Sequence, residues 1–87
     1  MLIVKILGTG CANCKRLEQA VREALTKNGI AHQVVKVTEY ADIMAYNILS
    51  TPGLVMNETV VSAGRIPSQQ QIVAWAKQYS TDAPSEQ

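Results

Sequence analysis

Residues 2–14 read LIVKILGTGCANC. This stretch begins with an aliphatic run, interrupted only by Lys5, that stops at Gly8-Thr9-Gly10, as a strand covered on both faces typically does. From Cys14 to Leu25, apolar residues then recur at steps of three and four, and polar residues fill the positions between them. The stretch therefore predicts a strand over residues 2–7 that passes through a glycine-rich turn into an amphipathic helix.

The rest of the chain predicts a further series of short elements. Asn28-Gly29 should end the first helix, because glycine suits the left-handed position that follows a helix. The two short strands of the second half are expected to pair through a hairpin at Asn57-Glu58. The expected elements are a strand over residues 30–37, a short helix over 40–48 capped by Thr38, strands over 54–56 and 60–63, and a last helix capped by Ser68 and Gln71.

The order of these elements predicts the fold class. The order is strand, helix, strand, helix, strand, strand, helix, and the first three form a right-handed parallel crossover unit. We therefore expect an α/β protein with a four-stranded mixed sheet and helices on both faces. One domain is expected over residues 1–79, followed by a flexible tail over 80–87, in which Ala83 is the single apolar residue.

The composition argues against several classes of function. The chain has 87 residues with eight Lys/Arg against seven Asp/Glu, so its net charge is +1 and it lacks the basic stripe that nucleic-acid binding needs. No run approaches the ~18 apolar residues of a membrane span. We expect a monomeric cytoplasmic protein that binds neither nucleic acid nor membranes.

The two cysteines of the chain, Cys11 and Cys14, lie where the first strand passes into the helix. Free backbone amides and the helix dipole favour an anion there, and such a position can lower the pKa of a thiol from ~8.5 to about 3.5–7.5. Cys11 is expected at the exposed rim, as the attacking thiolate. Cys14 is one turn further along, on the apolar face, where it would be shielded and would resolve a mixed disulfide by attacking Cys11. The pattern favours thiol–disulfide exchange without a cofactor.

Two other interpretations of the Cys-x-x-Cys motif stay open at this point. The cysteines could be packing residues, or they could form half of a copper or zinc site, since small metal carriers also place this motif between a strand and a helix. A structural zinc site takes four ligands, and His32, the one histidine of the chain, is expected far from the cysteines. A metal site would therefore need a second chain, and we assign no metal ligand.

The motif Gly8 to Cys14, followed by Ser50-Thr51-Pro52, resembles the thioredoxin superfamily. It is most similar to the small bacterial and archaeal thioredoxin-like "redox-active disulfide" proteins of glutaredoxin size, and the resemblance covers roughly Met1 to Tyr79. It implies a thioredoxin fold and a thiol-disulfide oxidoreductase, acting as a protein disulfide reductase or redox carrier.

The same resemblance implies a substrate site and partners. Pro52 would be a cis-proline facing the disulfide, and the Thr51 backbone would pair with a substrate peptide as a strand does. Gly10, Ala12 and Asn13 would complete the substrate-binding surface. The implied partners are disulfide-containing protein substrates and an electron donor similar to thioredoxin reductase.

The sequence departs from the family pattern at several positions. Gly10 stands where thioredoxins carry Trp, and Ala12-Asn13 replaces their Gly-Pro. The first strand offers Lys5 instead of a buried carboxylate, so the proton of Cys14 needs another route. Residues 62–65, Ser-Ala-Gly-Arg, lack the second glycine and the acid of a glutathione site. The alternatives to an oxidoreductase are a metal-binding Cys-x-x-Cys module and a redox-inactive thioredoxin-fold protein that only binds partners.

Overall fold

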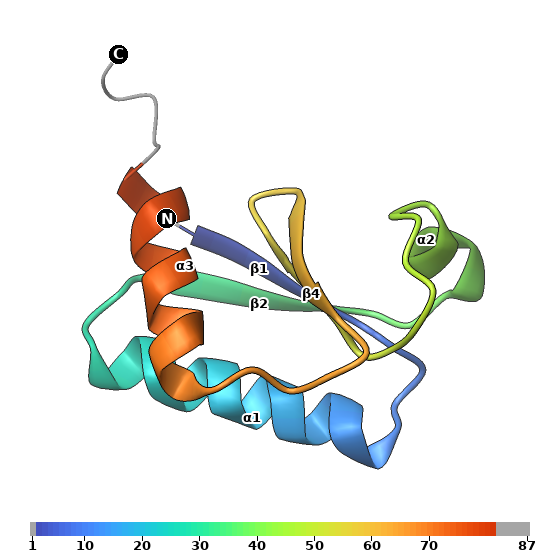
Figure 1. Cartoon of the computed structure of the whole chain (residues 1–87), viewed down its shortest axis with the longest axis horizontal. Coiled ribbons are helices and arrows are strands. Elements are labelled where there is room, and N and C mark those ends of the chain that lie inside the picture. The colour runs from blue at the N-terminus through green and yellow to red at the C-terminus, as the bar shows by residue number, and fades with distance from the viewer. Residues whose placement is uncertain (1, 82–87) are drawn as a thin grey trace.

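The computed structural model describes residues 2–81, and its elements follow the predicted order (Figure 1). None of the helices within residues 2–81 is long and apolar enough to cross a membrane. The elements are β1 (Leu2–Leu7), α1 (Ala12–Lys27), β2 (His32–Val37), α2 (Tyr40–Met44), β3 (Gly53–Met56), β4 (Thr59–Ala63) and α3 (Gln69–Thr81).

The four strands form one mixed sheet in the order β2-β1-β3-β4, which confirms the predicted fold class. β1 pairs in parallel with β2 and antiparallel with β3, and β3 pairs antiparallel with β4. At the end of β1, Leu7 lies opposite Val37 of β2 and opposite Gly53 of β3. The start of α1 and the segment before β3 therefore meet at the same end of the sheet.

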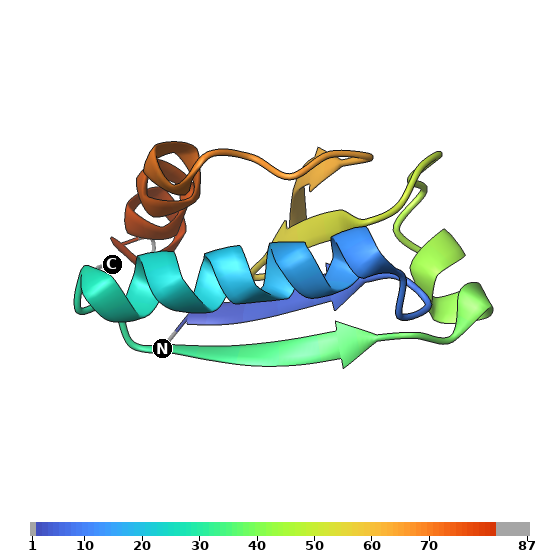
Figure 2. The ribbon, with the colours of Figure 1, turned by 90° about the horizontal axis from the view of Figure 1, so that it is seen from below.

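The sheet separates two apolar clusters, as the alternation of side chains along β1 requires. The larger cluster packs α1 and α3 on one face, with α1 lying along the sheet (Figure 2). The smaller cluster lies on the other face, where Leu7 and Val55 contact Ile43 of α2 and Ile48. The larger cluster consists of Leu2, Val4, Ile6, Leu17, Val21, Ala24, Leu25, Leu54, Met56, Ile72 and Ala76.

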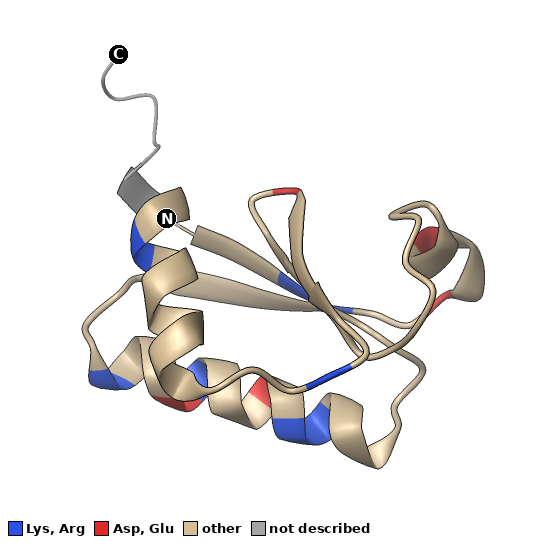
Figure 3. Cartoon of the chain, viewed as in Figure 1, with Lys and Arg blue, Asp and Glu red and all other residues tan. Residues whose placement is uncertain are grey.

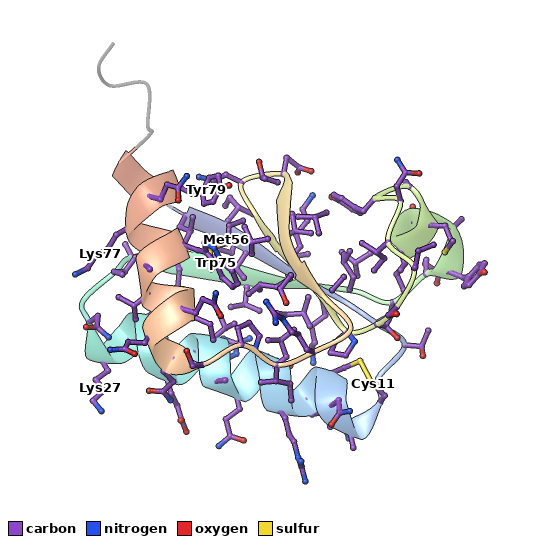
Figure 4. All side chains as sticks on the ribbon, viewed as in Figure 1. Cys11, Lys27, Met56, Trp75, Lys77 and Tyr79 are labelled. Carbon is purple, nitrogen blue, oxygen red and sulfur yellow. A yellow bond between two sulfur atoms is a disulfide. The ribbon has the colours of Figure 1, made fainter. Side chains whose placement is uncertain are left out.

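Trp75 and Tyr79 of α3 complete the larger cluster from its edge. Both are half-buried, and Figure 4 shows their side chains between α3 and the sheet, close to Met56. At the other end of α3, the Oγ of Ser68 accepts a hydrogen bond from Gln71 N at 3.2 Å, so the predicted serine cap is present.

The start of β2 and the two ends of α2 differ from the prediction. β2 begins at His32 instead of residue 30, because Ile30 N donates to Leu25 O at 2.9 Å and so belongs to the end of α1. The N-cap of α2 is Glu39 instead of Thr38, and its side chain makes no capping hydrogen bond. α2 ends at Met44 and does not reach residue 48, since Asn47 has a φ of 59°, which no right-handed helix accepts.

The end of the chain differs as well. α3 continues to Thr81, two residues beyond the predicted domain end at residue 79. The rest of the predicted tail, residues 82–87, lies outside the described residues. The domain boundary itself stays a prediction.

The hairpin between β3 and β4 is closed by Asn57 and Glu58, both with positive φ, at 49° and 70°. Glutamate is unfavourable at such a position, and its side chain supplies a compensation. Lys5 Nζ donates to Glu58 Oε2 at 2.6 Å and to the Tyr46 hydroxyl at 3.0 Å, and that hydroxyl donates to Glu58 Oε1 at 2.9 Å. These hydrogen bonds raise the pKa of Lys5 and lower that of Glu58. The network ties the hairpin to the α2 face of the sheet.

Candidate active site

The candidate site is the disulfide between Cys11 and Cys14 at the start of α1 (Figure 4). The Cα atoms of the two cysteines are 5.0 Å apart, within the usual range for a disulfide. Cys11 is the N-cap of the helix, and its Sγ accepts a hydrogen bond from Cys14 N at 3.1 Å. An amide donor and the positive end of the helix dipole therefore both act on this sulfur, and both favour an anion there.

The two cysteines differ sharply in exposure. Cys11 is exposed, whereas Cys14 retains only 5% of its accessible surface. The backbone of Gly8 packs against Cys14, so closely that a Cβ at Gly8 would lie less than 3.0 Å from the Cys14 Sγ. Glycine at this position thus makes room for the buried sulfur. An approaching molecule can reach Cys11 but not Cys14.

The segment before β3 borders the same site. The peptide bond between Thr51 and Pro52 is cis, and Pro52 O accepts a hydrogen bond from Gly64 N at 2.9 Å. Because Gly53 pairs with Leu7, Pro52 lies at the level of Gly8, beside the start of the Cys-x-x-Cys turn. Thr51 is exposed, whereas Pro52 is buried.

The other residues predicted to bind substrate surround Cys11. Gly10 is exposed and has a φ of 95°, a conformation that glycine adopts freely. Ala12 and Asn13 are exposed on the first turn of α1. Cys11 itself is exposed between them.

A groove of about 390 Å³ lies between α2 and the turn that precedes Cys11. Thr9 and Thr51 line it next to the disulfide. Its outer part is formed by Tyr40, Met44 and Leu49, three of the large apolar side chains that are exposed in this structure. Exposed apolar groups gathered in one place are typical of a contact surface for another molecule.

Basic residues lie near the start of α1 and acidic residues lie at α2, as the coloured ribbon shows (Figure 3). Lys15 and Arg16 follow Cys14 on α1 and are exposed, whereas Glu39 and Asp42 lie at α2. Within residues 2–81, none of these four side chains forms an ion pair. A partner that covers the disulfide therefore meets a basic edge on one side and an acidic, apolar edge on the other.

Comparison with known proteins identifies the family. The family model described as "Thioredoxin domain" matches residues 2–77. The chain belongs to the thioredoxin-domain family. It is 34% identical over 79 residues to a thioredoxin of Methanocaldococcus jannaschii, with 91% of both chains covered. It is 36% identical over 72 residues to a thioredoxin of Methanothermobacter thermautotrophicus, covering 83% of this chain and 94% of the relative.

A solved thioredoxin has the same fold. It is a thioredoxin-2 described as a component of the protein secretion machinery of the malaria parasite. The TM-score is 0.65 at 16% sequence identity, over 90% of this chain and 82% of the other. The family model, the two thioredoxin relatives and the Cys11–Cys14 disulfide together show that this chain is a thiol-disulfide oxidoreductase with a Cys-x-x-Cys motif.

Two observations bear on the other interpretations of the cysteines. Among the described residues, no three His, Cys, Asp or Glu side chains gather where they could hold a metal ion. His32 lies opposite Leu2, at the far end of the sheet from Cys11, and its Nδ1 is 2.8 Å from Ile30 O.

Sequence reasoning missed two charged groups near the site. Glu18 and Lys36 both line a small cavity that Cys14 also lines. The four-residue spacing of Cys14 and Glu18 on α1 was a visible signal, because side chains at this spacing share a helix face. The pairing with Lys36 had no such signal, since it depends on how β2 packs beside α1.

Proposed function

We propose that the protein reduces disulfides in other proteins, with Cys11 as the nucleophile and Cys14 as the resolving thiol. The contrast between an exposed Cys11 at the helix N-terminus and a buried Cys14 carries this assignment. The thiolate is the reactive form of cysteine, and the amide of Cys14 and the helix dipole favour it at position 11. A substrate disulfide can thus meet the exposed Cys11 first, and the buried Cys14 is left to attack the mixed disulfide from inside the protein.

The exchange takes place in two steps. The Cys11 thiolate attacks one sulfur of a substrate disulfide, forms a mixed disulfide, and releases the other substrate sulfur as a thiolate. Cys14 then loses its proton and attacks the Cys11 sulfur, which breaks the mixed disulfide and releases the second substrate thiolate. The substrate gains two electrons and two protons, and the Cys11–Cys14 pair loses them. A second dithiol reverses these steps and regenerates the reduced protein.

The substrate would be an extended peptide segment. Thr51 precedes Pro52 at the rim of the site, with its backbone available for strand-like pairing. Gly10, Ala12 and Asn13 would meet the segment on the opposite side of Cys11. The absence of a side chain at Gly10 supports access to the sulfur.

The electron donor would be a dithiol enzyme similar to thioredoxin reductase, and the protein would act as a monomer in the cytoplasm. Thioredoxin relatives at 34% and 36% identity support the choice of donor. Residues 62–65, Ser-Ala-Gly-Arg, lack the pattern of a glutathione site, which argues against glutathione as the direct donor. The monomeric state and the cytoplasmic location stay predictions.

The roles of the two cysteines can be tested by trapping. Cys14→Ser should accumulate a covalent adduct with a protein disulfide substrate, because the attack occurs and the resolution does not. The matched variant Cys11→Ser should form no adduct, since the remaining thiol is buried. Mass spectrometry under non-reducing conditions measures both. Equal trapping by the two variants, or trapping by Cys11→Ser alone, would overturn the assignment.

A further inference from the structure

A cavity of about 120 Å³ is lined by the buried Cys14, whereas the exposed Cys11 does not line it. Cys14 and Glu18 line it from α1, Ile6 from β1, and Lys36 from β2. Ile6 and Lys36 are register partners in the parallel pair, so their side chains share the sheet face that α1 covers. A cavity of this size holds water where polar groups line it, since each water takes up about 30 Å³.

Glu18 brings the only carboxylate to the lining of this cavity. Its side chain is 18% exposed, and two cations hold it. Its Oε1 lies 3.6 Å from Lys36 Nζ, and its Oε2 lies 3.0 Å from Arg22 Nη2 and accepts a hydrogen bond from Arg22 Nε at 3.0 Å. These contacts come from two elements, so they fix the carboxylate in the lining of the cavity, one helical turn beyond Cys14.

Cys14 has no other described carboxylate beside it. β1 contributes Ile6 to the cavity, and Lys5 points to the opposite face, where it binds Tyr46 and Glu58. The charged groups that face the cavity are thus Lys15 and Glu18 from α1 and Lys36 from β2, with Arg22 behind Glu18.

We propose that Glu18, through water in this cavity, accepts the proton that Cys14 loses when it resolves a mixed disulfide. The inference rests on the proposed roles of Cys11 and Cys14. The Cys14 S–H bond breaks, its proton passes through water to the Glu18 carboxylate, and the thiolate attacks the Cys11 sulfur. The Cys11–Cys14 bond forms as the bond to the substrate sulfur breaks. The substrate leaves as a thiolate and takes up one proton from the solvent. Glu18 then releases the proton that it accepted to the solvent.

The acceptor needs to hold the proton only briefly. A carboxylate is a weaker base than a thiolate, so the transfer of the proton to the carboxylate is unfavourable by itself. The thiolate is consumed by the attack, which carries the reaction forward. At high pH, hydroxide from the solvent takes the thiol proton directly and the carboxylate loses its advantage. The proposal therefore requires a pH-dependent effect of Glu18.

Stopped-flow reaction of the reduced protein with dithiobis-nitrobenzoate isolates this step. Attack by Cys11 releases the first thionitrobenzoate at a rate that rises with reagent concentration. Attack by Cys14 releases the second at a rate that does not. In Glu18→Gln at about pH 7 we expect the second phase to be at least about tenfold slower and the first phase to be unchanged. At about pH 9.5 the second phase should return to the wild-type rate, because hydroxide then replaces the carboxylate as the base.

The matched control is Glu23→Gln, which removes an exposed carboxylate from the same helix but away from the cavity. It should match the wild type at both pH values. A second phase in Glu18→Gln that is unchanged or faster near neutral pH would overturn the proposal, the faster rate indicating simple repulsion between the two anions. Equal slowing at both pH values would also overturn it, since that marks a structural effect.

The failure of the proposed function gives a different result. If Cys14 were not the resolving thiol, the wild type would release one equivalent of thionitrobenzoate instead of two, or Cys14→Ser would still release two. The role of Glu18 fails on its own when the wild type releases two equivalents in two phases and Glu18→Gln does the same with equal rates.

Discussion

Replacing Gly8 with alanine should destabilise the oxidised protein more than the reduced one. The φ of Gly8 lies outside the left-handed region, so the cost of the alanine comes from contacts. Its Cβ would lie less than 3.0 Å from Cys14 Sγ and 3.4 Å from Cys14 Cβ, whereas relaxed contacts are about 3.5–4.0 Å. In the disulfide, Sγ is held by its bond to Cys11, so the backbone must move. Overpacking of this kind costs about 1–3 kcal/mol.

The reduced protein can relieve part of this clash, because the free Cys14 side chain can rotate about χ1. If the two redox forms differ by about 1–2 kcal/mol in their loss of stability, the reduction potential should become about 20–40 mV less negative. Equilibration with a dithiol buffer and counting of free thiols measures the potential. Urea unfolding of both forms measures the two losses.

Gly29→Ala is the control for this experiment. Gly29 has a φ of 67° and open space at its Cβ position, and it lies at the far end of α1 from the disulfide. Alanine there should cost about 1 kcal/mol in both redox forms, with an unchanged potential. The reasoning is refuted if Gly8→Ala destabilises both forms equally and leaves the potential at the wild-type value.

Three further predictions concern stability. Leu17→Ala should reduce the free energy of unfolding by about 2–5 kcal/mol in urea, because Leu17 is fully buried in the larger cluster; a loss below about 1 would contradict that packing. Leu49→Ser should stay within about 0.5 kcal/mol of the wild type in the same assay, since Leu49 is 99% exposed. The hydrogen bond from Lys5, and to a smaller extent that from Tyr46, lowers the pKa of Glu58. The ionised Glu58 therefore contributes fully to the stability of the protein above the ordinary carboxyl pKa of 4.5, and this contribution is lost as the pH falls through the pKa of Glu58 in the folded state. Acid should therefore destabilise the wild type more than Glu58→Gln in urea titrations, and equal acid sensitivity would contradict the Lys5–Glu58 contact.

Local patterns were enough to predict the elements and the exposure of the two cysteines. The three- and four-residue spacing of apolar residues from Cys14 to Leu25 determines which face of the helix is buried, and this spacing can be read from the local sequence alone. The same holds for the aliphatic run of β1 and for the glycine turn before Cys11. Boundaries were harder to predict, since the positive φ of Asn47 that ends the α2 segment leaves little trace in composition.

Contacts between distant elements could not be predicted in this way. The network of Lys5, Tyr46 and Glu58 joins β1, the segment after α2 and the turn between β3 and β4, so it requires the sheet register and the position of α2 together. The sequence predicts the hairpin at Asn57-Glu58, but not the side chains that hold Glu58 in it. Likewise, the contact of Glu18 with Lys36 needs the packing of α1 over β2. Charged residues on separate elements carry no pairwise signal in a single sequence.

The most direct test of the redox pair is an equilibrium titration of the wild-type protein, free of metal, across a series of thiol–disulfide buffers. Counting free thiols at each potential should give one two-electron transition, for Cys11 and Cys14 together, at roughly −200 to −290 mV. This is the result that a cycling pair requires. Retention of both thiols at every potential, with no intramolecular disulfide, would contradict the account.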